Sequence, residues 1–294
     1  CIRDSIKITA TAKEGYSEGL SAMSQGQITV NGNLELKADT AILARGNAIV
    51  KINEDGEHTT KIDGDMNFNY DKATSGTKVD ADVIVNLTGS ESYWNGNSKV
   101  TWGTGSIPEG LEKVTGIDLR INYGATWNPT YVEAADKGDS GTAILAQNKV
   151  TLNGGNINLT NAKDQQIKIE SLSGDNGNIK VGSADNSLAI TKENTATNLT
   201  VGATTEYSKE LAKGDIAEGL QQIADQVVDN TTGAGKSAAD NVTMAETGVL
   251  GETSVQVDDN GKIIVETIKE DVNSSNAGIC LLYTSDAADE LDGV

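Results

Sequence analysis

The 294-residue chain is poor in the residue types that most catalytic and metal sites use. It contains two cysteines, one histidine (His58) and one phenylalanine (Phe68). Because cysteine and histidine side chains hold zinc and other soft metals, we expect no centre of that kind and no cofactor. Aromatic residues make up 4% of the chain and apolar residues 37%, so a core must be built mainly from medium-sized aliphatic side chains.

Positive charge and long apolar runs are also scarce. The formal net charge is −20, and such a surface repels phosphate, which argues against nucleic acid or an anionic membrane as a partner. No run approaches the roughly 20 apolar residues of a membrane helix, so no membrane insertion by this chain is expected. The beginning of the chain also lacks the basic and apolar pattern of a signal peptide.

The two ends have the texture of foreign sequence. CIRDS (1–5) and CLLYTSDAADE (280–290) resemble translated sequencing adaptors, and we expect 1–5 and 280–294 to be non-native. Cys1 and Cys280 both fall in these ends, so the genuine protein is expected to have no cysteine. A disulfide between the two ends is the alternative explanation of the pair.

What the chain does contain is a short unit of the form Gly/Asn, polar, apolar, polar, apolar. Each copy predicts a strand of three to five residues with alternating faces. The copies are GQITV (26–30), GNLEL (32–36), GDMNF (64–68), NKVTL (148–152), GNINL (155–159), QQIKI (165–169), GNIKV (177–181), NSLAI (186–190), TNLTV (197–201) and GKIIV (261–265). A longer echo relates 29–36 to 62–68 at an offset of 32, with Gly32 matching Gly64.

Many short strands are compatible with a β-sandwich or with a parallel β-helix. The strands are too short and numerous for a sandwich, and the apolar positions lack large aromatic anchors. VTLNGGNINLT (150–160) poses the choice most sharply, because Gly154-Gly155 could form a hairpin turn, a phosphate loop or a solenoid corner. We predict the corner, and therefore an all-β, right-handed parallel β-helix over 6–202.

One long segment resembles a known family. In 111–160, GATWN (124–128) leads into an insert, and a V-x-L-x-GG-x-I-x-L pattern follows at 150–159, then I-x-I-x-x-L-x-G-x-x-G at 167–177. SESYWNGNS (90–98) is a weaker copy of the tryptophan element. Over about 20–202 this resembles the passenger domain of pertactin-like autotransporters. The resemblance implies a virulence-associated adhesin displayed at the bacterial outer-membrane surface, with a C-terminal translocator barrel in the full-length protein.

The texture changes after residue 202. SKELAKGDIAEGLQQIADQVVDN (208–230) carries Leu211, Ile216, Leu220, Ile223 and Val227 at helical spacing, which predicts one amphipathic helix or two. We expect 231–241 to be a linker. TSVQVDDNGKIIVET (253–267) predicts a β-hairpin, so we interpret 203–275 as a small α+β appendage or insertion.

Two motifs suggest catalysis or nucleotide binding, and each lacks its context. GDSG (138–141) places Ser140 as in chymotrypsin-like proteases, but the required base could only be His58, in the polar string EDGEHTT. GAGKS (233–237) lacks the first glycine and the preceding strand of a phosphate loop. We expect both motifs to be structural.

Ligand binding has weaker signals. SGDNGN (173–178) and VDDNGK (257–262) have the composition of calcium loops but match no calcium motif, so ordinary turns are expected. The candidate ligand contacts are aromatic residues that could stack on sugars or could instead staple the solenoid: Tyr93, Trp94, Trp102, Trp127 and Tyr131.

The sequence therefore predicts a non-enzymatic, surface-displayed adhesin or stalk. Its expected partner is a host-cell or matrix surface, or a glycan, and the 128–147 insert is the first choice for a contact loop. The alternatives are a polysaccharide-binding or polysaccharide-degrading β-helix, for which arginine is scarce, and an export scaffold without a ligand.

Overall fold

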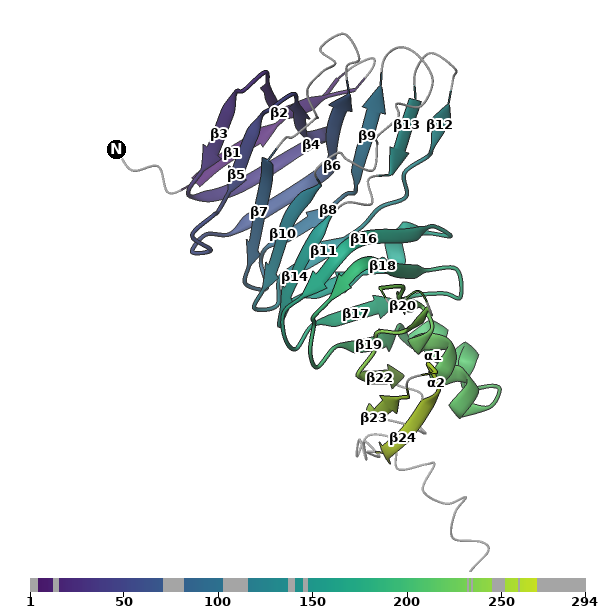
Figure 1. Ribbon diagram of the computed structural model, residues 1–294. Helices are drawn as coiled ribbons and strands as arrows, with labels where there is room; N and C mark the ends of the chain where they lie inside the picture. Colours follow the sequence, from purple (N-terminus) through teal and green to yellow (C-terminus); the bar gives the residue numbers. More distant parts are fainter. Residues whose placement is uncertain are drawn as a thin grey trace, which may run out of the picture.

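The computed structural model describes residues 5–12, 16–70, 82–102, 116–136, 141–144, 148–231, 233, 235–244, 252–258 and 260–268. Most of these residues lie in strands of two large sheets, here called sheet A and sheet B (Figure 1). The fold is all-β, and most of the strand pairs are parallel.

Sheet B has nine strands, and its neighbours are parallel except for the last pair. Its strands, in chain order, are β3 (Gln27–Val30), β5 (Ile49–Ile52), β7 (Asp82–Thr88), β10 (Ile117–Asn122), β14 (Lys149–Asn153), β16 (Gln166–Ser173), β18 (Ser187–Asn194), β20 (Val227–Asp229) and β21 (Lys236–Ser237).

Sheet A has 15 strands and carries antiparallel pairs only at its margins. They are β1 (Ser5–Thr9), β2 (Glu18–Met23), β4 (Asn33–Arg45), β6 (Thr60–Tyr70), β8 (Tyr93–Asn95), β9 (Ser98–Trp102), β11 (Thr126–Asn128), β12 (Ala135–Asp136), β13 (Gly141–Ile144), β15 (Asn156–Asn158), β17 (Asn178–Val181), β19 (Thr200–Ala203), β22 (Asn241–Met244), β23 (Glu252–Val257) and β24 (Ile263–Ile268).

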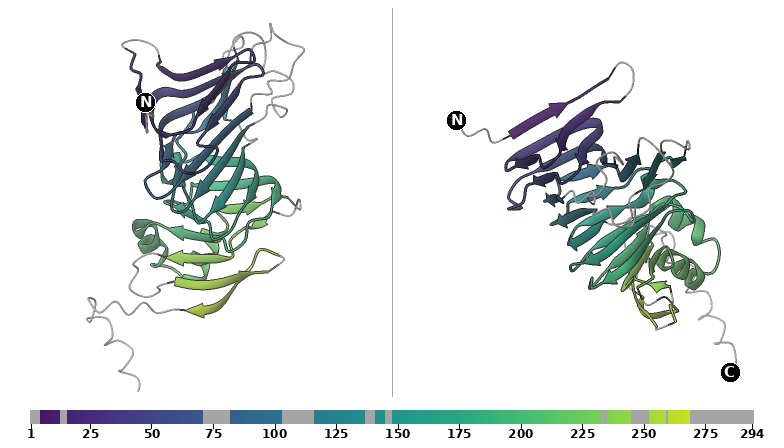
Figure 2. Two further views of the ribbon diagram at one scale, coloured as in Figure 1. Left: turned by 90° about the vertical axis from the view of Figure 1, so that its left-hand side faces the viewer. Right: turned by 45° about the horizontal axis from the view of Figure 1, so that its top comes forward.

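The chain alternates between the two sheets. From β3 to β22 the chain passes repeatedly from sheet B to sheet A and back, although β8 and β9, β11 to β13, and β20 and β21 are consecutive strands of one sheet. The strands stack along the molecule from β1 to β24 (Figures 1 and 2). All ten sequence units become strands, which confirms that part of the prediction. Two strands, β4 and β6, are much longer than the three to five residues expected.

The corner predicted in VTLNGGNINLT is confirmed. β14 belongs to sheet B and β15 to sheet A, so the two strands do not pair as a hairpin. Gly154 turns the chain with φ +62°, which favours glycine. A Cβ on Gly155 would lie 2.4 Å from the Ile121 carbonyl oxygen, so only glycine fits against the neighbouring strand.

The number of residues between paired positions of neighbouring strands varies along the chain, because the connections between the strands differ in length. Gln27 pairs with Ile49 and Lys149 with Ser171, an offset of 22 residues in both cases. Lys61 pairs with Tyr93, an offset of 32. The predicted match of Gly32 to Gly64 is wrong, because Asp63 pairs with Lys37; the register instead aligns Gly64 with Gly96.

The core consists of apolar ladders that run along the stack. In sheet A one inward position is occupied, strand after strand, by a fully or almost fully buried apolar residue. The members are Leu36, Ile62, Trp94, Trp127, Ile157, Ile179, Val201 and Val242. Each side chain is covered by the equivalent side chains above and below, so short strands suffice to exclude water.

Sheet A bends in its N-terminal half. β4 pairs with β1 through 33–37 and with β2 through 40–45, and a register shift separates the two halves. β6 pairs with β8 and then with β9. The bend at Gly64 is tight, because a Cβ there would lie 1.8 Å from the Ala38 carbonyl oxygen, and φ is +131°.

Ladders of hydrogen-bonded asparagine side chains run along the stack beside the apolar ladders. The Asn95 amide donates to Asp63 at 2.7 Å, that of Asn128 to Asn95 at 2.7 Å, and that of Asn158 to Asn128 at 3.0 Å. A second ladder joins Asn86, Asn122 and Asn153. Because an amide both donates and accepts, identical side chains can stack without an unpaired group.

The prediction of helices after residue 202 is confirmed, but the predicted helical segment extends too far toward the C-terminus. α1 (Thr205–Leu211) and α2 (Ile216–Ala224) are capped by Thr204 and Asp215. Leu220 and Ile223 are buried in the main core. Val227, expected on the helix, instead begins β20, which pairs in parallel with β18.

Both sheets continue beyond residue 202 through β20 and β22. The helices thus lie between β19 and β20 in the chain. The 231–241 segment contains β21, paired antiparallel with β20, and so is more than the linker expected. The predicted hairpin is confirmed by the antiparallel pairing of β23 with β24. The predicted foreign ends lie outside the described residues, except for Ser5.

Candidate functional site

The aromatic residues suggested as ligand contacts do not form one surface. Trp94 and Trp127 pair in register on β8 and β11 and are 0% exposed. Their rings stack with centroids 5.3 Å apart and planes at 8°. Trp102 on β9 is 4% exposed. A buried indole has no face for a sugar, so these three residues fill the core, in agreement with the stapling alternative.

The two stacked indoles are also tied to the bend of sheet A. Trp94 Nε1 donates to the Gly64 carbonyl at 2.9 Å, and Trp127 Nε1 donates to the Gly96 carbonyl at 3.0 Å. Burying an indole N–H without a partner would cost free energy, and these bonds avoid that cost. Trp94 therefore bonds to β6, and Trp127 bonds to the break between β8 and β9.

The two tyrosines of the set lie in different surroundings. The Tyr93 hydroxyl donates to Asp63 at 3.2 Å, and burial together with the Asp63 charge raises the pKa of Tyr93. Tyr131 is 47% exposed, and the Lys163 ammonium lies 5.5 Å from its ring centroid. A cation over an aromatic face is a favourable contact, and here it covers one face of the Tyr131 ring.

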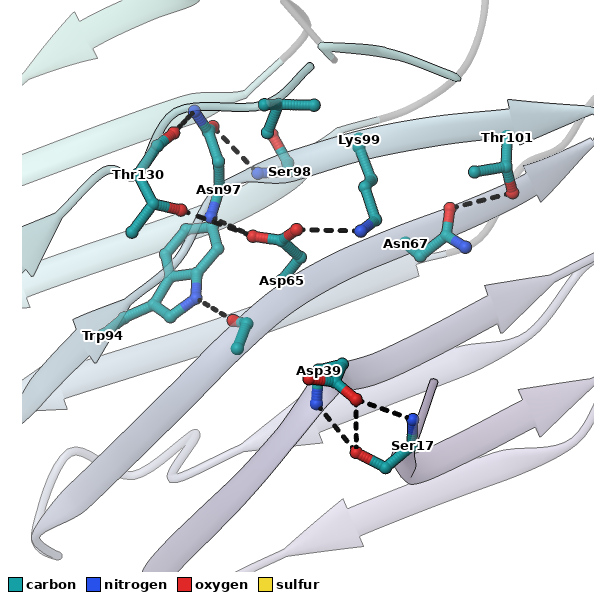
Figure 3. A network of polar contacts seen from close by, with 12 residues as sticks. Ser17, Asp39, Asp65, Asn67, Trp94, Asn97, Ser98, Lys99, Thr101 and Thr130 are labelled. Atoms are coloured by element: carbon teal, nitrogen blue, oxygen red, sulfur yellow. Dashed lines mark hydrogen bonds and ion pairs between the residues drawn. The ribbon is translucent and has the colours of Figure 1, made fainter. Parts of the chain in front are cut away.

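A polar network marks the bend of sheet A (Figure 3). The Asp65 carboxylate accepts from the Asn97 backbone N–H at 3.0 Å and pairs with the Lys99 ammonium at 2.8 Å. Asn97 Nδ2 donates to the Thr130 carbonyl at 2.9 Å. The Asp65 and Lys99 side chains are about four-fifths buried. The network therefore joins β6, the break between β8 and β9, and the start of the 128–147 insert.

A second carboxylate holds the bend one strand earlier. Asp39 accepts from the backbone N–H and the hydroxyl of Ser17, both at 2.9 Å, and its own N–H donates to that hydroxyl at 3.0 Å (Figure 3). The bond from the Ser17 N–H, followed by that from its hydroxyl, lowers the pKa of Asp39. Both carboxylates are engaged in structural bonds, which sequence reasoning did not single out.

The 128–147 insert, predicted as a contact loop, adds to sheet A. β13 pairs antiparallel with β9, and β12 pairs antiparallel with β13. Val132 is anchored by Gln165, whose side-chain amide exchanges two hydrogen bonds with the Val132 backbone, at 3.0 and 2.9 Å. The start of the insert is thus held at Val132, and its strands β13 and β12 extend sheet A beyond β9.

The protease motif gains no support from the described residues. Ser140 lies outside them. His58 is fixed within its own turn, where its N–H donates to Asn53 Oδ1 at 2.9 Å and its carbonyl accepts from Asn53 Nδ2 at 2.7 Å. Its Nε2 lies 3.7 Å from the Asp55 carboxylate.

GAGKS does not have the geometry of a phosphate loop. Lys236 and Ser237 form β21, which is paired with β20, and no helix begins there. The motif nevertheless lines a groove of about 420 Å³, together with Gln221, Asp225, Val228, Asn260, Gly261 and Lys262.

The two calcium-like loops use their carboxylates as turn caps. Asp175 accepts from Thr197 Oγ1 and from Asn198 Nδ2, both at 2.7 Å. Asp258 accepts from the Asn260 N–H at 2.9 Å and the Lys262 N–H at 2.8 Å. These bonds account for the lowered pKa values of both acids, as expected of ordinary turns.

The described residues contain neither a cluster of metal ligands nor a membrane-spanning helix. No group of three or more His, Cys, Asp or Glu residues there is placed to hold a metal ion. None of the helices in that part of the chain is long and apolar enough to cross a membrane.

Comparison with known proteins gives no relative: no family model matches the chain, and neither a curated protein nor a solved structure matches it.

Proposed function

We propose that this chain is a right-handed parallel β-helix that acts as a non-catalytic stalk and adhesin, displayed at a bacterial surface in the manner of an autotransporter passenger. The alternation of strands between two parallel sheets supports the helical path. Parallel crossovers are right-handed in nearly all proteins, which supports the hand.

The observation that carries the proposal is the placement of the long connections. Four long segments each follow a sheet A strand and precede a sheet B strand: 71–81, 103–116, 129–148 and 204–226. The return connections from sheet B to sheet A are short along most of the stack, as at Gly154-Gly155. The segment 204–226 contributes α2 to the core, but the other long segments leave one edge of a regular stack and can be varied without disturbing it, which suits a scaffold for binding loops.

The interior supports a mechanical role. The tryptophan and aliphatic ladder fixes one side chain per strand, and the Asn95–Asn128–Asn158 ladder pairs the amides outside it. Such a stack resists bending because every unit is held by its neighbours. Eight successive parallel strands of sheet B span about 35 Å at the usual strand spacing.

The test is a binding screen of the purified chain against a glycan array and immobilised extracellular-matrix proteins. Its matched variant replaces 133–147 with a short Gly-Ser segment, which keeps β11, the Val132 anchor and β14. A control variant shortens 71–81 in the same way.

We expect the wild-type chain and the 71–81 variant to bind the same target, and the 133–147 variant to lose at least about tenfold in affinity, or about 1.4 kcal/mol. The proposal is wrong if no target is bound, or if the chain depolymerises a polysaccharide and releases new sugar ends. A circular dichroism spectrum for each variant shows whether the sheets are retained.

A further inference from the structure

A groove near the C-terminal end of the stack gathers segments that are distant in sequence. It is lined by α2, by β20 and β21, and by the turn between β23 and β24, and its volume is about 420 Å³. The residues that matter here are Gln221, Asp225, Lys236, Asn260 and Lys262.

Specific contacts hold these segments together. Gln221 Nε2 donates to the Gly261 carbonyl at 2.9 Å, which ties α2 to the hairpin turn. A Cβ on Gly261 would lie 3.7 Å from Lys236 Cα, so the turn packs directly on β21. Ser237 Oγ donates to the Ala224 carbonyl at 2.8 Å, which joins β21 to the end of α2. The groove is thus built by tertiary contacts rather than by one loop.

The charges lining the groove differ from those of the whole chain. Lys236 and Lys262 both line it in a protein whose net charge is −20. Asp225, the one acid among the described lining residues, accepts a hydrogen bond from Gln221 Nε2 at 2.6 Å.

Two described acids beyond the lining, Asp229 and Asp258, accept hydrogen bonds from other donors. Asp229 accepts from the Thr231 N–H at 2.9 Å and from Asn194 Nδ2 at 3.2 Å. Asp258 caps its own turn. Among the described residues, the lining of the groove therefore combines two ammonium groups with one carboxylate, that of Asp225.

We propose that this groove binds the phosphate group of a small molecule. Lys236 and Lys262 supply the charge, and each ammonium carries N–H donors of the type that phosphate oxygens accept. Each lysine acts as a point charge, so the site does not depend on the helix-preceded loop that GAGKS lacks. The anion is either free phosphate or a phosphate ester.

Titration calorimetry at constant ionic strength tests the site with inorganic phosphate, glucose 6-phosphate and glucose. We expect the two phosphates to bind and glucose to be silent. Preference for the ester would identify a phosphorylated sugar as the ligand class, and preference for phosphate would identify the free ion. Lys236→Gln and Lys262→Gln should each weaken binding at least about tenfold, and Lys180→Gln, at an exposed lysine of β17, is the matched control.

Asp225→Asn separates an electrostatic role from a structural one. The asparagine Oδ1 can still accept from Gln221, while the negative charge is removed, so phosphate should bind several-fold more tightly. This readout also stands if a lysine variant fails to fold. Absence of phosphate binding, an equal loss in Lys180→Gln, or weaker binding by Asp225→Asn would overturn the proposal.

Discussion

Trp94 and Trp127 each make two kinds of contact: the ring packs in the apolar ladder of sheet A, and the ring N–H donates to a backbone carbonyl. Each indole occupies an inward position that is aliphatic in most other strands, and each ring N–H reaches a glycine carbonyl, that of Gly64 on β6 or of Gly96 between β8 and β9. A Cβ on Gly96 would lie 2.1 Å from the Gly64 carbonyl oxygen and 2.7 Å from Trp94 Nε1, so the bond between these two groups requires glycine at position 96. The Trp94–Gly64 and Trp127–Gly96 contacts therefore hold the bend of sheet A at two neighbouring positions along the stack.

Removal of the Trp127 side chain should be among the most destabilising changes in the chain. Trp127→Ala deletes a fully buried ring and its stack with Trp94, at a cost of about 3–5 kcal/mol in the free energy of unfolding. Trp127→Phe keeps a ring but leaves the Gly96 carbonyl without its donor, and about 1–3 kcal/mol is expected. Urea unfolding followed by far-UV circular dichroism measures both.

Tyr123 offers a matched control, because its ring is 77% exposed. Tyr123→Ala should change the free energy of unfolding by less than about 0.5 kcal/mol. A loss for Trp127→Ala no larger than that of the control would contradict the buried, stacked placement of the indole.

At the scale of elements, a charged side chain, Asp39, contributes a contact at the register shift of β4. Ser17 precedes β2, and Asp39 lies at the register shift where β4 leaves β1 and joins β2. The Asp39 carboxylate accepts two hydrogen bonds from Ser17. Since only the ionised form accepts both fully, the pKa of Asp39 is lower in the folded chain than in the unfolded one.

The sign of the resulting pH dependence follows from that depressed pKa. The stabilisation is present above the unfolded pKa, near 3.8, and is lost as pH falls through the lower folded value. In Asp39→Asn the unfolding midpoint should therefore fall less between about pH 5 and about pH 3 than in the wild type. Urea midpoints at the two pH values measure the difference.

Ser17→Ala is the graded partner of this variant. It removes the hydroxyl but keeps the backbone N–H, the larger of the two causes, so its pH dependence should lie between those of Asp39→Asn and the wild type. An Asp39→Asn variant with the same midpoint shift as the wild type would show that this contact does not contribute.

Which elements could be predicted depended on whether their signal was local. The ten strand units and the corner at Gly154-Gly155 carry their pattern within a few residues, and the structure has them where expected. Val227 fits the helical spacing equally well, yet it pairs with Leu188 in sheet B, a contact between residues far apart in the chain. The groove at Lys236 and Lys262 depends on three separate segments, so no local signal could indicate it.

The whole molecule has two unlike ends. At the C-terminal end, α2 packs against β22 and β24, and antiparallel strands complete sheet A (Figure 2). At the other end of the described chain, β1 has β4 as its one neighbour among the described strands, and Ile6 is 39% exposed. In a stack whose units are stabilised by their neighbours, a terminal unit with one neighbour opens at the lowest free energy.

Native-state hydrogen exchange followed by mass spectrometry should therefore show a gradient along the chain. Amides of β1 and of β2, both stacked only on β4, should exchange first, and those of β10 and β14, which have a partner on each side, should exchange last. Because β1 and β10 are similar parallel strands, their comparison isolates position in the stack. Simultaneous exchange of β1 and β10 would mean that the chain opens only as a whole, and that the ladders couple its ends more tightly than nearest-neighbour stacking allows.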